Sequence, residues 1–456
     1  MRANLELPLF LDEIIEATGG RSAKKLKNVK INAITTDTRD MHPGDLFVAL
    51  SGKHFDGEDF CDLAKASGCS YISARHTDGI MVENTEDALL AIVAHYRKKL
   101  HLKNIVAITG SVGKTTTKEL LYTIMRSSSK VHATSGNYNN YVGLAHTVLT
   151  APKDTEHLLV EIGMNHRGEI EKSSLALKPD IAVITRIGTA HIGNLGTREM
   201  IAKAKLEITR GISKNGTVLI PYGEYLLTES GGETVSITDT NANYCLIPTE
   251  YSNGKTAFIY TAHGKEVLRV KASVIGEGNL RALSFAIACA IKSGVDTEEI
   301  SDGIYKISSD NLRQKYILWQ DRLIIDDSYN ASLESVVSSL EIMRCFSGRR
   351  CAVLGDMYEL GSETEAIHFK AGAEAARLGV ERLFLHGIYS SFIKKGAVAS
   401  GVPESVVFQN ENLNDTHATV AAIKAHTSAG DIILFKASNA CRFGALINEL
   451  TSKEDS

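Results

Sequence analysis

The sequence predicts an α/β protein of about three domains, built on open and largely parallel sheets. The chain has 456 residues, which is too long for a single hydrophobic core. From about residue 100 onward, short apolar runs typical of buried strands alternate with stretches of helical periodicity. One of these runs, at residues 105–108, is followed by a glycine-rich turn and a helix, which is a common arrangement in nucleotide-binding α/β domains.

Composition and charge narrow the class of protein. Hydrophobic residues make up 43% and charged residues 23% of the chain, and the net charge is −4, so bulk charge indicates no nucleic acid or anionic membrane as a partner. No apolar run approaches the roughly 18–20 residues of a membrane span. The seven cysteines form no CxxC pair, which favours reduced thiols. We therefore expect a cytoplasmic protein.

Residues 1 to about 100 are expected to form a small α/β domain. Polar residues around one strand, Asp37–Arg39 and Ser51–Lys53, are suited to a phosphorylated ligand, although a polar surface loop explains them equally well. The expected elements are a helix at residues 9–15, strands at 46–50 and 71–73, and a helix at 86–100.

The central motif reads IVAITGSVGKTTTKE, at residues 105–119. Gly110 and Gly113 allow the backbone to approach a phosphate closely, and the backbone N–H groups of the turn converge there with the helix dipole. Lys114 can reach the outer phosphates, and the Thr115 hydroxyl can ligate Mg²⁺. The standard phosphate loop has a glycine where Ile108 stands, so this loop is a shorter version. A plain glycine turn explains the Gly-Lys-Thr run poorly, and the motif predicts a nucleoside triphosphate site.

Two further side chains follow apolar strands of the same region. Glu161 lies in the run 158–163, and His191 lies on the loop after the run 181–185. Carboxyl ends of parallel strands form the edge where ligands bind, and a carboxylate suits Mg²⁺. A surface glutamate is the alternative for Glu161, and for His191 a ligand and an ordinary polar residue are equally well supported.

The remaining central elements are less specific. An Asn- and Gly-rich segment at 135–143 is expected to be an exposed loop, and Lys203 and Lys205 are expected on the solvated face of a helix. The expected elements are a helix at 198–208, short strands around residues 218, 235, 257 and 267, and a helix at 283–291.

The last third alternates strands and helices again, which predicts a second open α/β sheet that closes over the nucleotide. One of its strands ends in two acids, Asp326 and Asp327. The expected strands are 323–325, 351–354, 382–385, 406–408 and 431–435, and the expected helices are 363–377 and 417–426.

These motifs, taken together, resemble the Mur ligases. The segments TGSVGKTTTKE, SGNYNNYVG, VEIGMNHRGEI, IGTAHI, AKAKLEI, IDDSYNA and VLGDMYELG occur in the family's order, and TTDTRDMHPGDLFVALSGKHFDGEDF resembles the segment that holds the UDP end of the substrate. The resemblance covers essentially the whole chain. VLGDMYELG together with TGSVGKTTTKE favours the type that adds D-alanyl-D-alanine, and the late DNPR motif of the diaminopimelate-adding type is not found.

The resemblance implies three domains: residues 1–100 for the UDP-substrate, a P-loop-type domain at 101–312 for ATP, and a Rossmann-like ligase domain at 313–456. It implies an ADP-forming ligase of peptidoglycan synthesis, which joins D-alanyl-D-alanine to UDP-N-acetylmuramoyl-tripeptide through an acyl phosphate. ATP and Mg²⁺ would be its cofactors. We expect a monomer.

The resemblance also assigns residue roles. Lys114, His191 and Lys205 would be catalytic, with Lys205 carbamylated. The implied metal ligands are Thr115 and Glu161 for one Mg²⁺, and His191 and Lys205 for a second. The implied ATP contacts are Gly110, Ser111, Val112, Gly113, Lys114, Thr115, Thr116, Asn279, Arg313, Asp327 and Asn330. The implied substrate contacts are Asp37, Thr38, Arg39, Ser51, Asn139 and Asn140.

Three segments depart from the family pattern. Gly278 and Ala282 stand where the family has His and Asn, Asn439 stands in place of an Arg, and Glu58 stands in place of a His. Two alternative functions therefore stay open. One is a Mur-like ligase with a different amine, and the other is a non-catalytic paralogue that binds nucleotide. The intact phosphate and metal residues argue against the paralogue.

Overall fold

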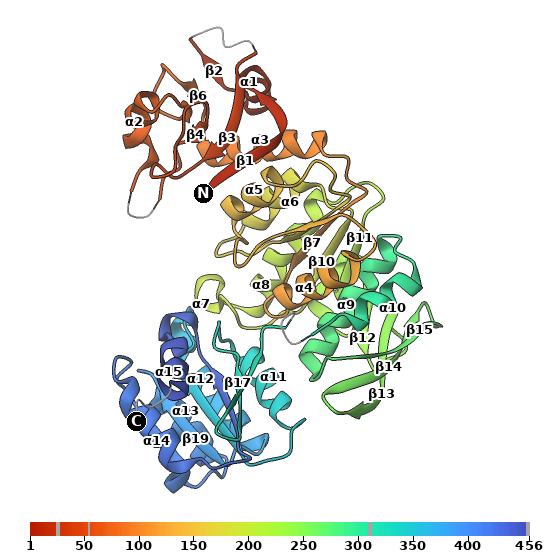
Figure 1. The fold of residues 1–456 in the computed structure, drawn as a ribbon, viewed down its shortest axis with the longest axis vertical. Coiled ribbons are helices and arrows are strands. Elements are labelled where there is room, and N and C mark those ends of the chain that lie inside the picture. Colours follow the sequence, from red (N-terminus) through yellow and green to blue (C-terminus); the bar gives the residue numbers. More distant parts are fainter. Residues whose placement is uncertain (24–27, 53–54, 309–311, 453–456) are drawn as a thin grey trace. The chain divides into compact units, whose positions relative to one another are not determined.

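The computed structural model describes residues 1–23, 28–52, 55–308 and 312–452 (Figure 1). Lys53 of the predicted polar loop lies outside the described residues. The chain forms two compact units. The first comprises Met1–Thr109, Ser128–Val183 and Ala204–Val218, and the second comprises Gly110–Ser127, Ile184–Lys203 and Leu219–Ser456.

The first unit begins with a six-stranded sheet of order β1-β3-β4-β5-β6-β2. Its inner strands are parallel, and the edge strands β1 and β2 run antiparallel to their neighbours. The strands are β1 (Arg2–Phe10), β2 (Arg21–Ser22), β3 (Lys30–Thr35), β4 (Leu46–Val48), β5 (Ser70–Ser73) and β6 (Ile80–Met81), and the helices are α1 (Leu11–Thr18), α2 (Cys61–Ala66) and α3 (Thr85–Lys99).

The helix expected at residues 9–15 is partly wrong. Leu9 and Phe10 end strand β1, where they pair with Ile31 and Lys30 of β3, so the helix begins only at Leu11. Pairing with a strand twenty residues further along the chain overrides the local helical pattern.

The first unit also contains the strands that surround the predicted phosphate loop in the sequence. Their order is β10-β7-β9-β8, and β9 pairs in parallel with both β7 and β8. The strands are β7 (Asn104–Thr109), β8 (Val131–Ala133), β9 (His157–Glu161) and β10 (Ile181–Ile184), and the helices are α5 (Tyr141–Leu149) and α6 (Glu169–Leu177). The predicted parallel sheet is confirmed.

The exposed loop expected at 135–143 ends earlier than the sequence indicates. Asn140 caps α5 by accepting a 2.9 Å hydrogen bond from the backbone N–H of Gly143, and Gly143 is buried inside that helix. A Cβ on Gly143 would collide with the backbone of Tyr138, so the glycine serves close packing here.

In the second unit, α4 (Lys114–Met125) packs against α9 (Glu277–Lys292) and α10 (Thr297–Tyr305). Strands β11 to β15 lie side by side in chain order. The first pairs are parallel, whereas β13-β14 and β14-β15 are antiparallel hairpins. The helices and strands between β10 and α9 are α7 (Ile192–Leu195), α8 (Arg198–Leu206), β11 (Thr217–Pro221), β12 (Glu233–Ile237), β13 (Tyr244–Ser252), β14 (Lys255–Ala262) and β15 (Lys265–Ala272).

The last third of the chain, cyan to blue in Figure 1, forms a second six-stranded sheet of order β16-β17-β21-β18-β19-β20. All neighbours are parallel except β16 and β17. The strands are β16 (Lys315–Trp319), β17 (Arg322–Asp326), β18 (Arg350–Gly355), β19 (Arg382–His386), β20 (Val407–Asn410) and β21 (Ile432–Lys436), and the helices are α11 (Leu333–Met343), α12 (Thr364–Arg377), α13 (Ser390–Ala399), α14 (Thr416–His426) and α15 (Phe443–Thr451).

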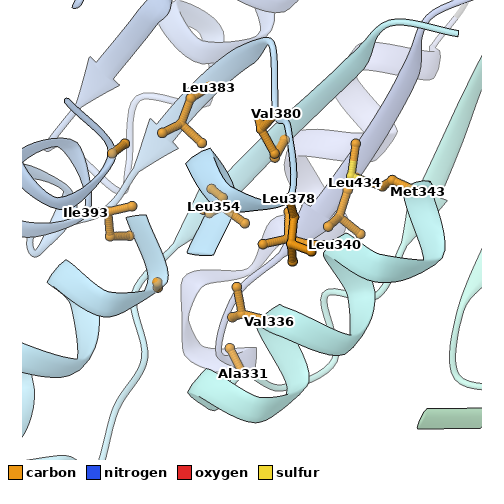
Figure 2. Close-up of a cluster of buried hydrophobic side chains, with 14 of the residues drawn as sticks. Ala331, Val336, Leu340, Met343, Leu354, Leu378, Val380, Leu383, Ile393 and Leu434 are labelled. Carbon is orange, nitrogen blue, oxygen red and sulfur yellow. The ribbon is translucent and has the colours of Figure 1, made fainter. Parts of the chain in front are cut away.

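Hydrophobic clusters cover both faces of this second sheet. Figure 2 shows one of them, in which Val336, Leu340 and Met343 of α11 gather with Leu354 and Leu434 of the strands. The predicted second open α/β sheet is confirmed. With three sheets that each carry helices, the predicted α/β class is confirmed as well. Within the described ranges, no helix combines the length and the apolar character that crossing a membrane demands.

Candidate active site

The glycine-rich turn begins directly after β7, at Gly110, and ends where α4 begins. Gly110 has φ +147° and Gly113 has φ +92°, conformations that side chains with a Cβ rarely adopt. A Cβ on Gly110 would also collide with the Thr185 hydroxyl. The turn therefore requires glycine at these positions, as the phosphate-loop prediction expects.

A set of hydrogen bonds holds the turn in shape. The Thr185 hydroxyl donates to the Val112 carbonyl (2.6 Å), and the backbone N–H of Ser111 donates to the Arg186 carbonyl (2.8 Å). The backbone N–H of Gly188 donates to the Ser111 hydroxyl (3.0 Å). Lys114 Nζ donates to the Gly110 carbonyl (2.7 Å), which keeps the ammonium group at the loop. A pre-shaped loop at a helix N-terminus, with a cation beside it, is suited to the phosphates of a nucleotide.

Thr115 and Arg313 lie together. Arg313 Nη2 donates to Thr115 Oγ1 at 2.5 Å, and the guanidinium carbon lies 4.6 Å from the centre of the Tyr329 ring. The structure thus joins two residues that the sequence places almost two hundred positions apart. Thr116, the next predicted ATP contact, is buried.

Glu161 and Asn139 form a second pair, in the first unit. Glu161 is 1% exposed at the end of β9, and the Asn139 side-chain amide donates to Glu161 Oε1 (3.0 Å). The Gly163 N–H donates to the Asn139 carbonyl (2.7 Å). The alternative of a surface glutamate is therefore wrong. A buried carboxylate held by an amide is a suitable hard-oxygen ligand for Mg²⁺.

His191 lies beside an acid that sequence reasoning missed. His191 Nδ1 is 2.7 Å from Glu359 Oε2, and both residues have left-handed backbone, with φ +66° and +63°. The His191 imidazole lowers the pKa of the Glu359 carboxyl. The neighbouring Thr189 donates its backbone N–H (2.8 Å) and its hydroxyl (3.2 Å) to Glu334. Glu359 lies inside the motif VLGDMYELG, so its segment, but not its role, was visible in the sequence.

Lys205 corrects one expectation. The helical pattern placed it with Lys203 on a solvated face, but Lys205 is 2% exposed, whereas Lys203 is exposed. Two residues on, Glu207 is also buried, accepts two 2.9 Å contacts from the Gly168 N–H, and has its pKa raised by burial. Lys205 is therefore a buried side chain and not part of a solvated helix face.

The remaining third-domain candidates form a buried polar network. Lys436, 3% exposed, donates to Asp327 Oδ2 (3.0 Å) and to the Asn330 carbonyl (2.7 Å). The same Asp327 oxygen accepts from Ser339 (2.5 Å) and Gln314 (3.3 Å), and the Asn279 amide donates to Gln314 (3.1 Å). Burial lowers the pKa of the Lys436 ammonium, and Asp327 opposes that effect. Sequence reasoning missed Gln314, Ser339 and Lys436.

Four of the six predicted substrate contacts, Asp37, Thr38, Arg39 and Ser51, lie in loops of the N-terminal sheet, and Asn139 and Asn140 precede α5. Arg39 binds Asp37 through two side-chain hydrogen bonds (2.9 and 2.7 Å), and this pairing lowers the pKa of Asp37. Thr38 between them is half-buried. Ser51 is exposed and donates to Asp56 (3.1 Å). The Asn140 side chain caps α5, so its amide oxygen already has a partner.

One departure from the family pattern has a packing explanation. A Cβ on Gly278 would collide with the Ser338 hydroxyl of α11, so the glycine lets α9 and α11 approach closely. Ala282, further along α9, is buried. Asn439 is exposed, and nothing in the structure explains why it replaces an arginine.

Three stretches of the chain match family models. They are "Mur ligase family, catalytic domain" at residues 30–106, "Mur ligase middle domain" at 108–290 and "Mur ligase, glutamate ligase domain" at 313–439. A relative from Bacillus subtilis, named UDP-N-acetylmuramoyl-tripeptide--D-alanyl-D-alanine ligase, is 33% identical over 434 residues, which is 92% of this chain and 93% of the relative. This chain belongs to the Mur ligase family.

Solved Mur ligases agree with the assignment. MurF from Acinetobacter baumannii superposes with a TM-score of 0.89 at 28% identity, over 98% of this chain and 99% of that one. MurF from Thermotoga maritima, solved in complex with ADP, gives a TM-score of 0.80 at 26% identity, over 92% and 96%. The predicted family, the three-domain α/β fold and the prediction of a ligase are thereby confirmed. The predicted domain bounds and site residues stay predictions.

Proposed function

We propose that this Mur ligase uses ATP to join D-alanyl-D-alanine to UDP-N-acetylmuramoyl-tripeptide and yields the pentapeptide precursor, ADP and phosphate. The observation that carries the proposal is the 33% identity, over 93% of its length, to a relative named for that reaction. The pre-shaped phosphate loop with Lys114 supports it independently, because the reaction begins with transfer of a phosphoryl group.

The chemistry proceeds in two steps. A carboxylate oxygen of the peptide attacks the γ-phosphorus of ATP, and the bond to the β-bridging oxygen breaks, giving ADP and an acyl phosphate. The amine of the dipeptide then attacks the acyl carbon, a proton leaves the nitrogen, and phosphate departs from the tetrahedral intermediate. Positioning and charge neutralisation dominate catalysis of such steps.

The proposal gives each group of residues one task. The N–H groups of Gly110–Gly113 and the Lys114 ammonium bind the β- and γ-phosphates and neutralise the charge that builds on them. Arg313, Asp327 and Asn330 bind ATP from the third domain, and Asn279 binds it from the central domain. Asp37, Thr38, Arg39 and Ser51 hold the UDP end, and Asn139 and Asn140 position the substrate.

Magnesium is proposed as the metal cofactor. The ligands would be Thr115 and Glu161 for one ion, and His191 with carbamylated Lys205 for the second. Glu161 fits, because it is a buried carboxylate, and Lys205 would offer an anionic oxygen to the metal in its carbamylated form. These residues belong to different compact units, so their grouping depends on the family resemblance. When bound, Mg²⁺ supplies charge stabilisation at the phosphoryl oxygens.

The domain bounds 1–100, 101–312 and 313–456 belong to the same proposal. We also propose that the enzyme is a monomer and works in the cytoplasm.

A second candidate function is the same ligase chemistry with another amine as the incoming substrate. Asn439 favours it, because an exposed residue of the third domain differs from the family pattern there.

Product analysis tests the proposal. The protein is incubated with ATP, Mg²⁺, D-alanyl-D-alanine and UDP-N-acetylmuramoyl-tripeptide carrying either lysine or diaminopimelate, and the products are measured by mass spectrometry. The proposal predicts the pentapeptide with one ADP and one phosphate per peptide bond. Tripeptide-dependent ADP release that gives the pentapeptide only with another dipeptide or amino acid supports the second candidate. Folded protein that binds ATP and releases no ADP contradicts both.

A further inference from the structure

Three side chains of the N-terminal sheet region gather outside the predicted substrate contacts. Glu58 lies in the 3₁₀ helix η1 (Gly57–Phe60), Cys61 begins α2, and His76 lies on the loop between β5 and β6. One possible ligand atom from each lies within 4.8 Å of the other two. Cys61 is fully buried, Glu58 is 3% exposed, and His76 is half-buried.

The carboxylate of Glu58 is fixed in place. It accepts hydrogen bonds from the Ser73 hydroxyl and from the Ala74 N–H (2.7 Å). Ser73 in turn accepts from the backbone N–H of His76 (2.8 Å), so one hydroxyl orients both the acid and the histidine loop. Metal ligands commonly have such outer-shell partners.

The salt bridges near this cluster do not involve Glu58. The nearby Arg75 pairs with Asp56, and in the described part of the chain no salt bridge to Glu58 is found. A buried carboxylate without a counter-ion is costly, and a bound cation would remove that cost.

We propose that Glu58, Cys61 and His76 form a Zn²⁺ site. A sulfur, an imidazole nitrogen and a carboxylate oxygen are the ligand types that Zn²⁺ prefers, whereas Mg²⁺ prefers oxygen alone. Three protein ligands leave a fourth tetrahedral position for water. On binding, the S–H bond of Cys61 breaks, a Zn–S bond forms, and the proton leaves to solvent.

The site has a consequence for the neighbouring loop. Asp56 caps η1, pairs with Arg75, and accepts a hydrogen bond from Ser51 (3.1 Å). A metal that ties η1 to the loop of His76 also restrains Asp56 and its partner Ser51, which the proposed function assigns to the UDP end. Zinc binding itself does not depend on that function.

Metal binding to the full-length protein tests the site. Metal-free protein is titrated with Zn²⁺ in excess Mg²⁺, and separately with Co²⁺, which gives a near-ultraviolet charge-transfer band when a thiolate binds it. We expect one tight Zn²⁺ per chain, a raised melting temperature, and the cobalt–thiolate band. Cys61→Ser and His76→Ala should each weaken Zn²⁺ binding by more than about 100-fold. Loss of an outer-shell partner lowers metal affinity by about 10- to 100-fold, and loss of a ligand should lower it further.

The matched control is Cys69→Ser, which alters another buried cysteine of the same hydrophobic cluster. It should keep the zinc affinity and the cobalt band. If Cys61→Ser does not fold, the zinc affinity of His76→Ala tests the site instead. His76 is half-buried on a loop, so its substitution should leave the fold intact. Wild-type protein without a cobalt–thiolate band, or zinc affinity unchanged in His76→Ala, overturns the proposal. Neither readout requires the ligase reaction.

Discussion

Single residues of the phosphate loop determine whether the turn forms. Gly110→Ala places a Cβ against the Thr185 hydroxyl at a φ of +147°. We expect it to lower the free energy of unfolding by about 1–3 kcal/mol and to weaken ATP binding, because the strained turn distorts the N–H groups. Urea denaturation and nucleotide titration measure the two effects.

Gly444→Ala is the matched control, because a Cβ at that position in α15 has open space around it. That change should leave ATP binding unaltered and raise stability slightly, by about 0.5–1 kcal/mol. Equal effects of the two substitutions would contradict the role given to Gly110.

Lys114→Ala removes the cation beside the loop. We expect ligase turnover to fall at least about 100-fold with little change in melting temperature, because the group acts on developing charge. Lys130→Ala, which removes a lysine whose side chain is 71% exposed, should leave turnover unchanged. Full turnover in Lys114→Ala would contradict the assignment of Lys114 to the phosphate site.

Residue-level prediction succeeded where a local motif dictates the chemistry. The glycines of the loop and the acid at the end of β9 are visible in short stretches of sequence. Lys205 was misplaced although the signal existed, because Ile201, one turn before it on the same helical face, is buried. The missed Gln314, Ser339 and Glu359 carry no local signature, since their partners come from other elements.

At the scale of elements, the ends of neighbouring strands bring charges together. Asp327 follows β17, and Lys436 ends β21, the parallel neighbour of β17. Lys436→Met should lower the free energy of unfolding by about 3–5 kcal/mol, because it leaves a buried acid without its cation. The double variant Asp327→Asn with Lys436→Met should recover part of that loss in urea denaturation. A double variant less stable than either single one contradicts the pairing.

The contact between His191 and the loop after β18 makes a separate prediction. Glu359→Gln removes the carboxylate that contacts His191 Nδ1 while it keeps the size of the side chain. We expect turnover to fall about 10-fold with stability within about 0.5 kcal/mol of wild type, because the partner orients the imidazole. The control is Glu363→Gln, which changes an exposed glutamate four residues further on. It should leave turnover and stability unchanged. Identical kinetics for both variants would contradict a role of Glu359 in orienting His191.

Strands and helices with strong local patterns were predicted well, and elements defined by distant partners were not. The apolar runs that became β7, β9, β10, β17, β18 and β21 needed no other information. Strand β1 was misread because its pairing with β3, which local pattern does not reveal, determines its conformation. Strand β16 likewise exists as the antiparallel partner of β17.

For the whole molecule, buried histidines predict a pH dependence of stability. Burial lowers the pKa of His157, His368 and His386 below 6.5. The unfolded chain therefore binds protons that the folded chain does not, and the free energy of unfolding should fall as pH decreases from about 7.5 to 5.5. Urea denaturation across this window measures it, and His157→Gln should reduce the slope. Stability that rises toward acid in this window contradicts the assignment.

The active site as a whole is assembled from residues that the sequence separates widely. Loop chemistry predicts a nucleotide site, but only the resemblance to the Mur ligases groups Lys114, Glu161, His191, Lys205 and Arg313. Thr115 and Arg313 are in contact within the second unit, and Asn139 and Glu161 are in contact within the first. The family relationship then supplies the reaction that these residues are proposed to perform.

Transfer of labelled oxygen tests the central claim most directly. UDP-N-acetylmuramoyl-tripeptide labelled with oxygen-18 in its reacting carboxylate is incubated with the protein, ATP, Mg²⁺ and D-alanyl-D-alanine, and the phosphate is analysed by mass spectrometry. An acyl phosphate predicts one labelled oxygen in every phosphate released with the pentapeptide. Pentapeptide with unlabelled phosphate, or phosphate without pentapeptide, would contradict the account.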